Sequence, residues 1–356
     1  MEKSEANPVV SVIVPARNEE ACLAACLESL VGQTGINYEI IVVDDASTDR
    51  TGEIARSFSG LEVIEAGPLP ENWTGKNHAM SAGAKIAKGK WLLFTDADTV
   101  HKPGSLAHAV AEAEQHGAAL LSYSPEQEVR TLWEKAVMPV IFAELAATHP
   151  PSKVSDPNSP IAAANGQYLL ISRAAYDAIG GHTKIASDLL EDVAIARRVK
   201  SSGRKIFFRY GGDAVRTRMY RTWEQMKEGW SKNLALLFPG ARVLGLLRGC
   251  EFVLIWASIV ASIALFFYKD AEFAVGTASL AGILLVLFWW RIRRAHFSIA
   301  SNLLGLGGLG IFAYLLLRSV SVRRKGAVKW KGREYVGNSE ETQAEPVQTG
   351  SSGRFR

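Results

Sequence analysis

The chain has 356 residues, of which 48% are hydrophobic and 21% charged, with three cysteines and a formal net charge of +4. This composition excludes a disordered chain, a collagen and a small disulfide-stapled secreted module, and the charge is too small to indicate a nucleic-acid partner. Most of the apolar excess lies between residues 250 and 318.

The amino-terminal segment, MEKSEANPVV, runs directly into the apolar stretch VSVIVP. It has no basic region followed by an apolar region, and so it does not have the pattern of a secretory signal peptide. We therefore expect the domain that follows to remain in the cytosol.

Strands and helices alternate over the first hundred residues. Runs of apolar, often β-branched residues predict strands buried on both faces, at 9–15, 38–45, 61–66 and 91–98. Helical apolar spacing or a Ser/Thr/Asp cap predicts helices between them, at 19–31, 47–58 and 76–87. This alternation predicts an α/β fold with a mostly parallel sheet and helices on both faces.

Three polar clusters stand where predicted strands end. They are PARNEE after the first strand, DDAS after the second and DAD after the fourth. Ligands of such sheets bind beyond the carboxyl ends of the strands. We therefore expect the three clusters to share one rim of the sheet and one site.

The elements after the fourth strand are less regular. Residues 131–148 predict a helix kinked at Pro139, which is either a core helix or a helix on the membrane surface. A strand is predicted over 161–171, a capped helix over 187–203 and a late strand over 205–210.

Three successive stretches, 252–268, 273–290 and 299–317, carry no charge. Each is close to the lower end of the length that spans a bilayer. Buried helices of a soluble domain are the alternative, but three such runs in succession exceed the pattern of a soluble core. We therefore predict a membrane region at this end of the chain.

These runs divide the chain into four parts. We expect a cytosolic domain, an interfacial helix, a membrane region of about three hydrophobic helices, and a tail that is basic and then disordered: 1–234, 235–250, 251–318 and 319–356. Basic residues favour the cytosolic side, which is where Arg291, Arg293 and Arg294 belong. Three full crossings would put the basic tail outside. Either the Gly-rich third run does not cross fully, or the charge rule fails here.

Asp96 and Asp98 directly follow an apolar strand. Two carboxylates so spaced can share Mg²⁺ or Mn²⁺, which prefer oxygen ligands and often also hold substrate phosphates. A turn with capping aspartates is the alternative. Asp44 and Asp45 can accept hydrogen bonds from a base or a ribose. Lys76, at a predicted helix start, suits a phosphate, although it could also be an ordinary surface lysine.

The order of these motifs resembles that of the family 2 inverting glycosyltransferases of the GT-A fold. The resemblance covers about residues 9–235 and rests on P-x-R-N-E-E, V-V-D-D-A-S-x-D, G-K-x-x-A, D-A-D and L-L-E-D. The loop G-P-L-P-x-x-W-x-G-K, the segment W-S-K-N and the ending W-K-G-R-x-Y resemble most the membrane-anchored hopene-associated, carotenoid and lipid glycosyltransferases. This implies a GT-A nucleotide-diphospho-sugar transferase domain followed by C-terminal transmembrane helices.

The resemblance also implies how the nucleotide is held. Pro15, Arg17 and Glu19 match the positions that line the nucleotide pocket. Asp44, and with it Asp45, matches the position that holds uracil and ribose. The expected donor is therefore a nucleotide sugar, with UDP as the nucleotide.

The catalytic roles are carried over in the same way. Asp96 and Asp98 match the motif for the cation and the diphosphate, with Asp98 as the direct ligand. In the E-D motif of Glu191 and Asp192, the aspartate would be the general base; the alternative is a solvated helix carboxylate. A single displacement would invert the anomeric centre while the cation and Lys76 stabilise the leaving diphosphate.

The segment QMKEGWSKN, residues 225–233, departs from the Q-x-x-R-W motif of processive polysaccharide synthases. Trp230 would form an acceptor platform, with core packing as the alternative, and Lys232 would approach the diphosphate. The missing arginine argues against chain polymerisation and favours a single transfer to a membrane lipid.

The predicted protein is thus a multi-pass enzyme of the inner cell membrane, with its catalytic domain facing the cytosol. Its expected partners are a nucleotide sugar, a lipid acceptor and the bilayer, with no nucleic acid. Its expected cofactor is a divalent cation, Mg²⁺ or Mn²⁺. A processive polysaccharide synthase, a nucleotidyltransferase and a non-catalytic GT-A membrane scaffold are the competing hypotheses.

Overall fold

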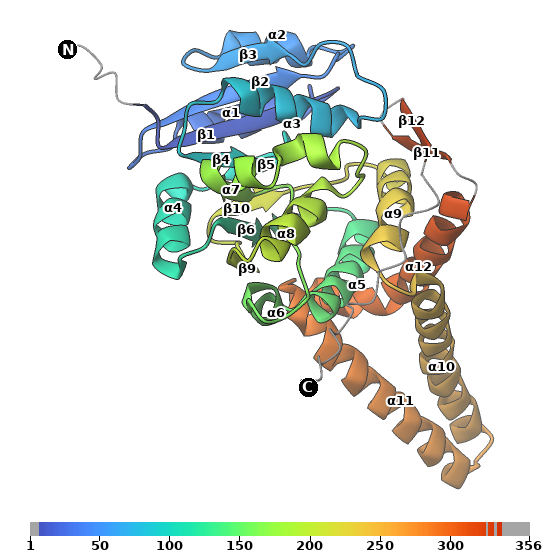
Figure 1. The fold of residues 1–356 in the computed structure, drawn as a ribbon. Coiled ribbons are helices and arrows are strands. Elements are labelled where there is room, and N and C mark those ends of the chain that lie inside the picture. Colours follow the sequence, from blue (N-terminus) through green and yellow to red (C-terminus); the bar gives the residue numbers. More distant parts are fainter. Residues whose placement is uncertain (1–6, 325–326, 331–332, 337–356) are drawn as a thin grey trace, which may run out of the picture.

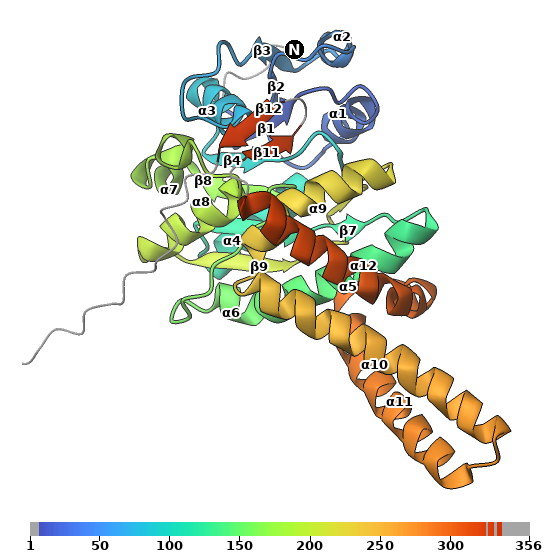
Figure 2. The same cartoon turned by 90° about the vertical axis from the view of Figure 1, so that its right-hand side faces the viewer.

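The computed structural model describes residues 7–324, 327–330 and 333–336. An α/β domain is built on a central sheet, and a group of long helices packs against it (Figure 1). Two of these helices, α10 and α11, project from the rest as a hairpin (Figures 1 and 2).

The central sheet has seven strands in the order β3-β2-β1-β4-β8-β6-β9. All adjacent pairs are parallel except those made by β8, which runs antiparallel to both of its neighbours. The predicted mostly parallel α/β sheet is confirmed. The strands are β1 (Val10–Ala16), β2 (Tyr38–Asp44), β3 (Glu62–Glu65), β4 (Trp91–Phe94), β6 (Leu120–Ser124), β8 (Leu169–Ser172) and β9 (Ile206–Tyr210).

Helices cover both faces of this sheet because its central strands are apolar on both sides. Val12 packs in the core that includes α1, and Ile13 packs in the core that includes α3. A Cβ on Gly83 of α3 would lie 2.6 Å from Ile13, so only glycine lets this helix approach the sheet so closely. The covering helices are α1 (Leu23–Val31), α2 (Thr51–Ser57), α3 (Gly75–Ile86), α4 (Ser105–His116), α7 (Arg173–Ala178) and α8 (Glu191–Ser201).

A small second sheet extends the rim of the domain. It has the order β5-β10-β7, formed by β5 (Thr99–His101), β10 (Val215–Thr217) and β7 (Glu126–Gln127). The hydroxyl of Thr217 donates to the carbonyl oxygen of Asp98 at 3.2 Å. This contact ties the second sheet to the loop that carries the DAD motif. Two short helices, α6 (Pro151–Ser155) and the 3-10 turn η1 (Gly181–Ile185), complete the domain.

The third core is helical. It joins α5 (Leu132–Thr148) and α9 (Trp223–Leu237) to the long helices α10 (Ala241–Phe267), α11 (Ala271–Ile292) and α12 (Ile299–Arg324). A capping box of Thr131 and Glu134 starts α5. Val137 and Ile141 of α5 are fully buried. Of the two alternatives for this stretch, its packing is that of a core helix.

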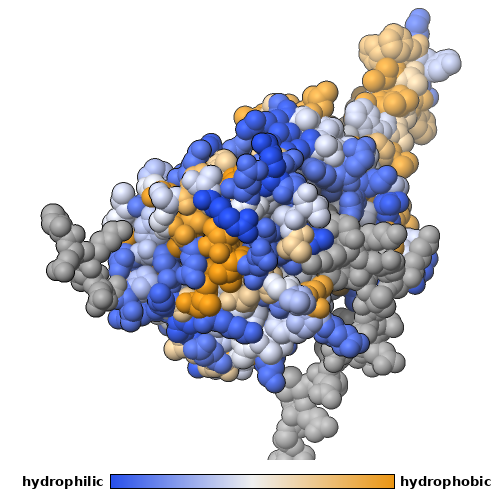
Figure 3. Space-filling view, turned by 90° about the horizontal axis from the view of Figure 1, so that it is seen from above, coloured by the Kyte–Doolittle hydropathy of each residue, from blue (hydrophilic) through white to orange (hydrophobic). Residues whose placement is uncertain are grey.

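Within the described residues, three helices are long and apolar enough to cross a membrane, by length and composition alone: α10, the segment Ala271–Ala295 and α12. The α10–α11 hairpin exposes large apolar side chains over most of its length, including Val253, Val260, Ile263, Phe266, Val275, Ile283, Val286 and Leu287. Seen from above, the hairpin projects as a hydrophobic arm from a mainly hydrophilic face crossed by one hydrophobic band (Figure 3).

The predicted boundaries after residue 234 need correction. No separate interfacial helix forms over 235–250, because α9 ends at Leu237 and α10 begins at Ala241 and runs unbroken to Phe267. The break lies at Gly240, whose φ of 72° is left-handed and favours glycine. Gly245 and Gly249 lie within α10 and do not interrupt it.

Two further boundaries differ from prediction. The predicted strand over 161–171 begins only at Leu169. The predicted tail from residue 319 starts as helix, since α12 extends to Arg324. Beyond it, β11 (Ala327–Trp330) pairs antiparallel with β12 (Arg333–Val336). The disorder predicted for the rest of the tail concerns residues outside those described.

Candidate functional site

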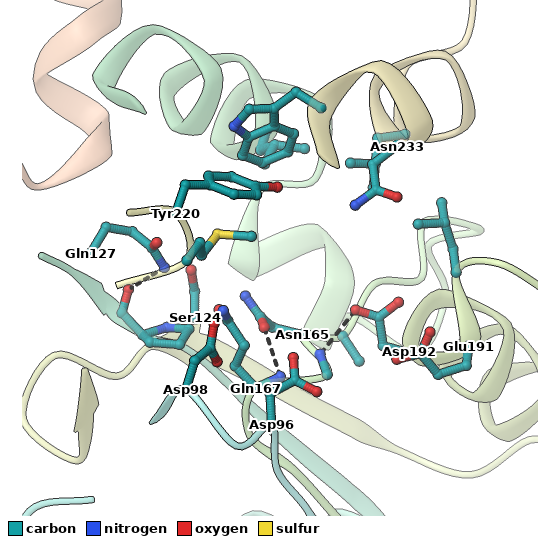
Figure 4. Close-up of a pocket in the computed structure, with 18 of the residues that line it drawn as sticks. Asp96, Asp98, Ser124, Gln127, Asn165, Gln167, Glu191, Asp192, Tyr220 and Asn233 are labelled. Atoms are coloured by element: carbon teal, nitrogen blue, oxygen red, sulfur yellow. Dashed lines mark hydrogen bonds between the residues drawn. The ribbon is translucent and has the colours of Figure 1, made fainter. Parts of the chain in front are cut away.

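A cavity of about 840 Å³ opens at the rim where β1, β2 and β4 end. The predicted site residues that line it are Pro15, Arg17, Glu19, Asp45, Lys76, Asp96, Asp98, Glu191, Asp192, Trp230 and Lys232. Residues from distant parts of the chain therefore meet in one cavity. Figure 4 shows the two aspartates of the DAD motif and the Glu191–Asp192 pair around it.

The part of the rim formed by the loops after β1 and β2 is held together by Arg17. Its guanidinium donates to the carbonyl oxygens of Asp45 at 2.6 Å and Ala46 at 3.2 Å, which fixes the loop after β2 against the loop after β1. Asp44 does not line the cavity with its neighbours. Its carboxylate accepts from the backbone N–H of Ser47 at 3.0 Å and so stabilises the turn after β2.

The start of α3 organises the segment that leads into α8. Thr74 caps α3, with its hydroxyl accepting from the N–H of Asn77 at 3.2 Å. The buried Asn77 amide donates to the carbonyl oxygens of Ile185, Ala186 and Asp188, at 2.7, 3.1 and 2.9 Å. The helix that carries Lys76 therefore also fixes the loop immediately before the E-D motif.

Lys76 joins the two acidic motifs. Its ammonium nitrogen lies 2.6 Å from Asp96 Oδ1 and 2.6 Å from Glu191 Oε1. Burial disfavours the charged ammonium, but the two carboxylates outweigh burial and hold the pKa of Lys76 well above its usual value. Lys76 is therefore a fixed positive charge at the centre of the site.

Asp192 is held by two backbone donors. Its Oδ2 accepts from the N–H of Gly166 at 2.9 Å, and its Oδ1 accepts from the N–H of Val193 at 2.7 Å (Figure 4). Burial, followed by the charge of the adjacent Glu191, raises the pKa of Asp192 to about 7. A carboxylate poised in this way can accept a proton near neutral pH.

A buried polar network supports the loop of the DAD motif. The hydroxyl of Thr99 donates to the carbonyl oxygen of Asp96 at 2.7 Å, and that of Thr95 donates to the carbonyl oxygen of Gln167 at 2.8 Å. His101 Nε2 lies 3.0 Å from the Thr95 hydroxyl. Burial lowers the pKa of His101 to about 3, so the imidazole is neutral. These residues position the aspartates from beneath.

The donor set suits a cation that is shared with a substrate. Among residues 7–324 and the two short strands beyond, no group of three or more His, Cys, Asp or Glu side chains could hold a metal ion. Asp96 and Asp98 line one cavity, and Lys76 contacts only Oδ1 of Asp96. Two carboxylates fit Mg²⁺ or Mn²⁺ when a diphosphate and water supply the other ligands.

Another side of the cavity is lined by α9, which contributes Trp230 and Lys232. Trp230 is 2% exposed, and its ring packs edge-on to Tyr220 at 5.8 Å and to Phe142 at 6.3 Å between centroids. It therefore both packs in the core and lines the cavity. Burial lowers the pKa of Lys232 to about 8, against the opposing influence of carboxylates such as Glu191.

The loop Asn165–Gly166–Gln167 was missed because these residues were predicted to belong to a strand. Asn165 accepts from the N–H of Gln167 at 3.0 Å, and this turn presents the Gly166 N–H to Asp192. A Cβ on Gly166 would lie 3.0 Å from Glu191 Oε1 and 3.1 Å from Lys76 Nζ, so the loop packs tightly on the charged groups. The Asn-Gly dipeptide is a turn signal that could have revealed it.

Comparison with known proteins identifies the family. Residues 11–178 match the family described as glycosyl transferase family 2. Residues 11–178 form a family 2 glycosyltransferase domain. The predicted family and enzyme class are confirmed.

Two relatives show how far the likeness extends. The 4,4'-diaponeurosporenoate glycosyltransferase of Staphylococcus aureus is 25% identical over 343 residues, which cover 92% of this chain and 88% of the relative. The protein of the same name from Staphylococcus haemolyticus is 30% identical over 239 residues, 66% of this chain and 63% of that protein. The first likeness includes the long apolar helices as well as the α/β domain.

A solved structure shares the fold of this glycosyltransferase. The mannosyltransferase from Pyrobaculum calidifontis, in complex with GDP-Man and Mn²⁺, superposes with a TM-score of 0.52 over 90% of this chain and 88% of that chain. The two sequences are 17% identical. This likeness confirms the predicted GT-A fold.

Proposed function

We propose that this glycosyltransferase moves one sugar from a nucleotide-diphospho-sugar, with UDP as the expected nucleotide, to a hydroxyl of a membrane lipid, with inversion. The observation that carries the proposal is that Asp96, Asp98 and Asp192 line one cavity, in which Lys76 bridges Asp96 and Glu191. The relatives named 4,4'-diaponeurosporenoate glycosyltransferase support a lipid acceptor.

The donor is expected to lie between the β-strand rim and Lys76. Asp45 and the loop held by Arg17 face the nucleoside, and Asp96 and Asp98 face the diphosphate. An ammonium group has three N–H donors. Lys76 uses two on carboxylates, which leaves one for a phosphate oxygen. When bound to Asp96 and Asp98, a divalent cation would supply positive charge for the leaving diphosphate.

Asp192 is proposed as the general base. It takes the proton of the acceptor hydroxyl as that oxygen forms a bond to the anomeric carbon. The bond from that carbon to the phosphate oxygen breaks on the opposite side, and the nucleoside diphosphate leaves. One displacement inverts the centre, so the protein supplies no nucleophile. Glu191 holds Lys76 and raises the pKa of Asp192, and is not itself the base.

The membrane arrangement proposed for the enzyme has two crossings, made by the α10–α11 hairpin. The carboxyl-terminal half of α12 instead contacts α9 of the catalytic domain. Arg318 donates to the hydroxyl of Ser231 at 3.1 Å, and the N–H of Ala235 donates to that of Ser319 at 2.8 Å. The apolar window of α12 is 44% buried, compared with 11% and 17% for α10 and α11.

Two crossings return the chain to the cytosolic side. The basic end of α12, with Arg323 and Arg324, then lies on the side that the charge rule favours. This favours the alternative in which the third apolar run does not cross fully. The catalytic domain is proposed to face the cytosol of a cell membrane.

Cysteine labelling tests this topology in a Cys250→Ala background. Asp270→Cys at the hairpin tip, Ser321→Cys on α12 and Ser57→Cys on α2 are all at exposed positions. In intact spheroplasts, a membrane-impermeant maleimide is expected to label only the hairpin tip. Labelling of both residue 270 and residue 321 would require a third crossing and overturn the arrangement.

The activity itself is tested with membranes that contain the protein. These are incubated with a panel of radiolabelled nucleotide sugars, and the extracted lipid is identified by mass. We expect one sugar to be incorporated per lipid, and Asp192→Asn to lower the rate by about 10³-fold while nucleotide-sugar binding persists. Polymeric product, or undiminished turnover of Asp192→Asn, would contradict the proposal.

A further inference from the structure

The cavity has an apolar lobe in addition to its charged centre. The side chains that line this lobe come from α5, β9, α9 and the linker after α11: Phe142, Leu145, Ala146, Phe208, Leu237 and Phe297. A nucleotide sugar is strongly polar, so donor binding does not account for an apolar surface in the cavity. An apolar surface that opens from a catalytic centre points to a second, apolar ligand.

One wall of the lobe is a continuous row of aromatic rings. Phe297 and Phe142 lie 6.1 Å apart between ring centroids, Phe142 and Trp230 lie 6.3 Å apart, and Trp230 and Tyr220 lie 5.8 Å apart. Burial, reinforced by the charge of Asp98, raises the pKa of Tyr220. The row therefore begins at Phe297, in the linker between α11 and α12, and ends at Tyr220, beside the DAD motif.

The outer end of the lobe lies in the linker between the long apolar helices. This linker includes the 3-10 turn η2 (Arg293–Ala295). The guanidinium of Arg294 stacks over Trp290 at 3.9 Å, and His296 stacks on Tyr210 at 4.1 Å with the rings 9° from parallel. Aromatic side chains and arginines gather where a membrane meets water. In the proposed membrane arrangement, the outer end of the lobe therefore lies where the α10–α11 hairpin meets the catalytic domain.

We propose that the apolar lobe receives the hydrocarbon chain of a single-chain membrane alcohol and guides its terminal hydroxyl along the aromatic row to Asp192. The inference rests on the proposed function. It adds the route by which the acceptor reaches the site and the number of hydrocarbon chains in the acceptor, which is one. Pockets for one small ligand measure roughly 300–1,000 Å³. At about 840 Å³ in total, the cavity suits one chain beside the donor rather than two.

The geometry also explains why the acceptor need not leave the bilayer. Its chain enters laterally past Tyr210 and His296, and only its hydroxyl end reaches the polar centre. The apolar row contributes an environment in which the inserted chain keeps its CH₂ groups away from water. A water-soluble alcohol of the same terminal chemistry lacks this contribution and should be a poor acceptor.

Photolabelling tests the site directly. The probe is a sixteen-carbon primary alcohol with a mid-chain diazirine, added to vesicles that contain the purified full chain. We expect crosslinks in the peptides that cover residues 142–149 and 295–297. Ala146→Trp fills the lobe and should reduce these crosslinks at least fivefold. Leu287→Trp, at a 54% exposed position on α11, is the matched control and should leave them unchanged.

The outcomes separate this inference from the proposed function. Crosslinks confined to the exposed faces of α10 and α11, or insensitive to Ala146→Trp, would overturn the lobe as a chain site. Lobe crosslinks without transfer from any nucleotide sugar would uphold the lobe and reject the function. If Ala146→Trp does not keep the thermal midpoint of the parent chain, Leu237→Trp fills the lobe from the opposite wall and replaces it.

Discussion

The ammonium nitrogen of Lys76 lies 2.6 Å from the carboxylate of Glu191. Lys76 comes from the start of α3 and Glu191 from the start of α8, so this ion pair joins two helices that are distant in the chain. The same ammonium contacts Asp96 at 2.6 Å. The Lys76 ammonium thus fixes the spacing between the two sides of the site, the DAD motif and the E-D motif.

Replacing Lys76 is expected to separate these two sides. In Lys76→Met, Asp96 and Glu191 repel each other and a donor to the diphosphate is lost. We expect kcat/KM to fall by about 10²–10³-fold. Lys85→Met, on the exposed side of the same helix, is the control and should retain parental rates. Equal loss in both variants, measured by lipid-linked label, would mean that the effect is a general one on α3.

The pH dependence of the transfer rate should follow the ionisation of the Asp192 carboxyl group. Because its pKa is raised to about 7, the carboxylate gains a proton as the pH falls below that value. Only the ionised form can act as a base, so the rate should fall about tenfold per pH unit on the acid side. Initial rates between pH 5 and 9 measure this limb. A rate that stays constant down to pH 5, as an unperturbed aspartate would give, would reject the assignment.

The cation requirement should depend on Asp98. We expect a chelator to abolish transfer and Mn²⁺ or Mg²⁺ to restore it. Asp98→Asn removes a charged ligand and should raise the cation concentration for half-maximal rate by more than about tenfold. Asp177→Asn, at an exposed position on α7, is the control. Full activity in the presence of chelator would exclude a metal at the DAD motif.

The contact between α12 and α5 depends on Gly308. A Cβ at this position would lie 1.9 Å from the carbonyl oxygen of Ala136, which cannot move without disturbing α5. Gly308→Ala should therefore destabilise the protein by about 1–3 kcal/mol. At the neighbouring Gly307 a Cβ meets nothing within 4 Å, so Gly307→Ala should be neutral or slightly stabilising. Thermal unfolding in detergent compares the two.

Four charged side chains connect the membrane hairpin to the catalytic domain. Arg248 contacts Glu144 and Glu251, each at 2.8 Å. Arg291 contacts the same two carboxylates, at 3.0 and 2.8 Å. The four side chains are each 20% exposed or less. They form a closed, neutral ring that joins α5, α10 and α11.

Breaking the ring should loosen the hairpin. Arg291→Met leaves two carboxylates with one partner, and we expect a loss of about 3 kcal/mol in the free energy of unfolding. Arg293→Met, two residues away and exposed, should change it by less than about 0.5 kcal/mol. Detergent melting curves measure both. A similar, small effect in each would show that the ring contributes little.

The sequence alone was sufficient for the architecture of the α/β domain. Apolar runs such as Val10–Ala16 and Tyr38–Asp44 are buried on both faces and can form only central strands. The carboxylates that follow β4 lie on the rim because parallel strands end at the same edge of a sheet. The local sequence pattern therefore predicted the order of the elements. It also predicted that most of the candidate residues lie together at one edge of the sheet.

Other features depended on contacts between distant segments. The sequence could not distinguish Asp45, which lines the cavity, from Asp44, which stabilises a turn. Nor did it indicate that Arg291, predicted to mark a cytosolic loop, lies in an ion-pair ring. Side-chain direction and ion pairing arise from packing between elements, and residue type and spacing do not encode them.

By itself, the sequence determined which residues could do chemistry and which runs are apolar enough for a membrane, because composition and period depend only on neighbouring residues. The tertiary structure decided that Lys76 links the two acidic motifs, that Gly166 supplies a donor to Asp192 and that α12 rests on α5 and α9. Each of these depends on where separate segments meet, and that is set by the packing of the whole chain.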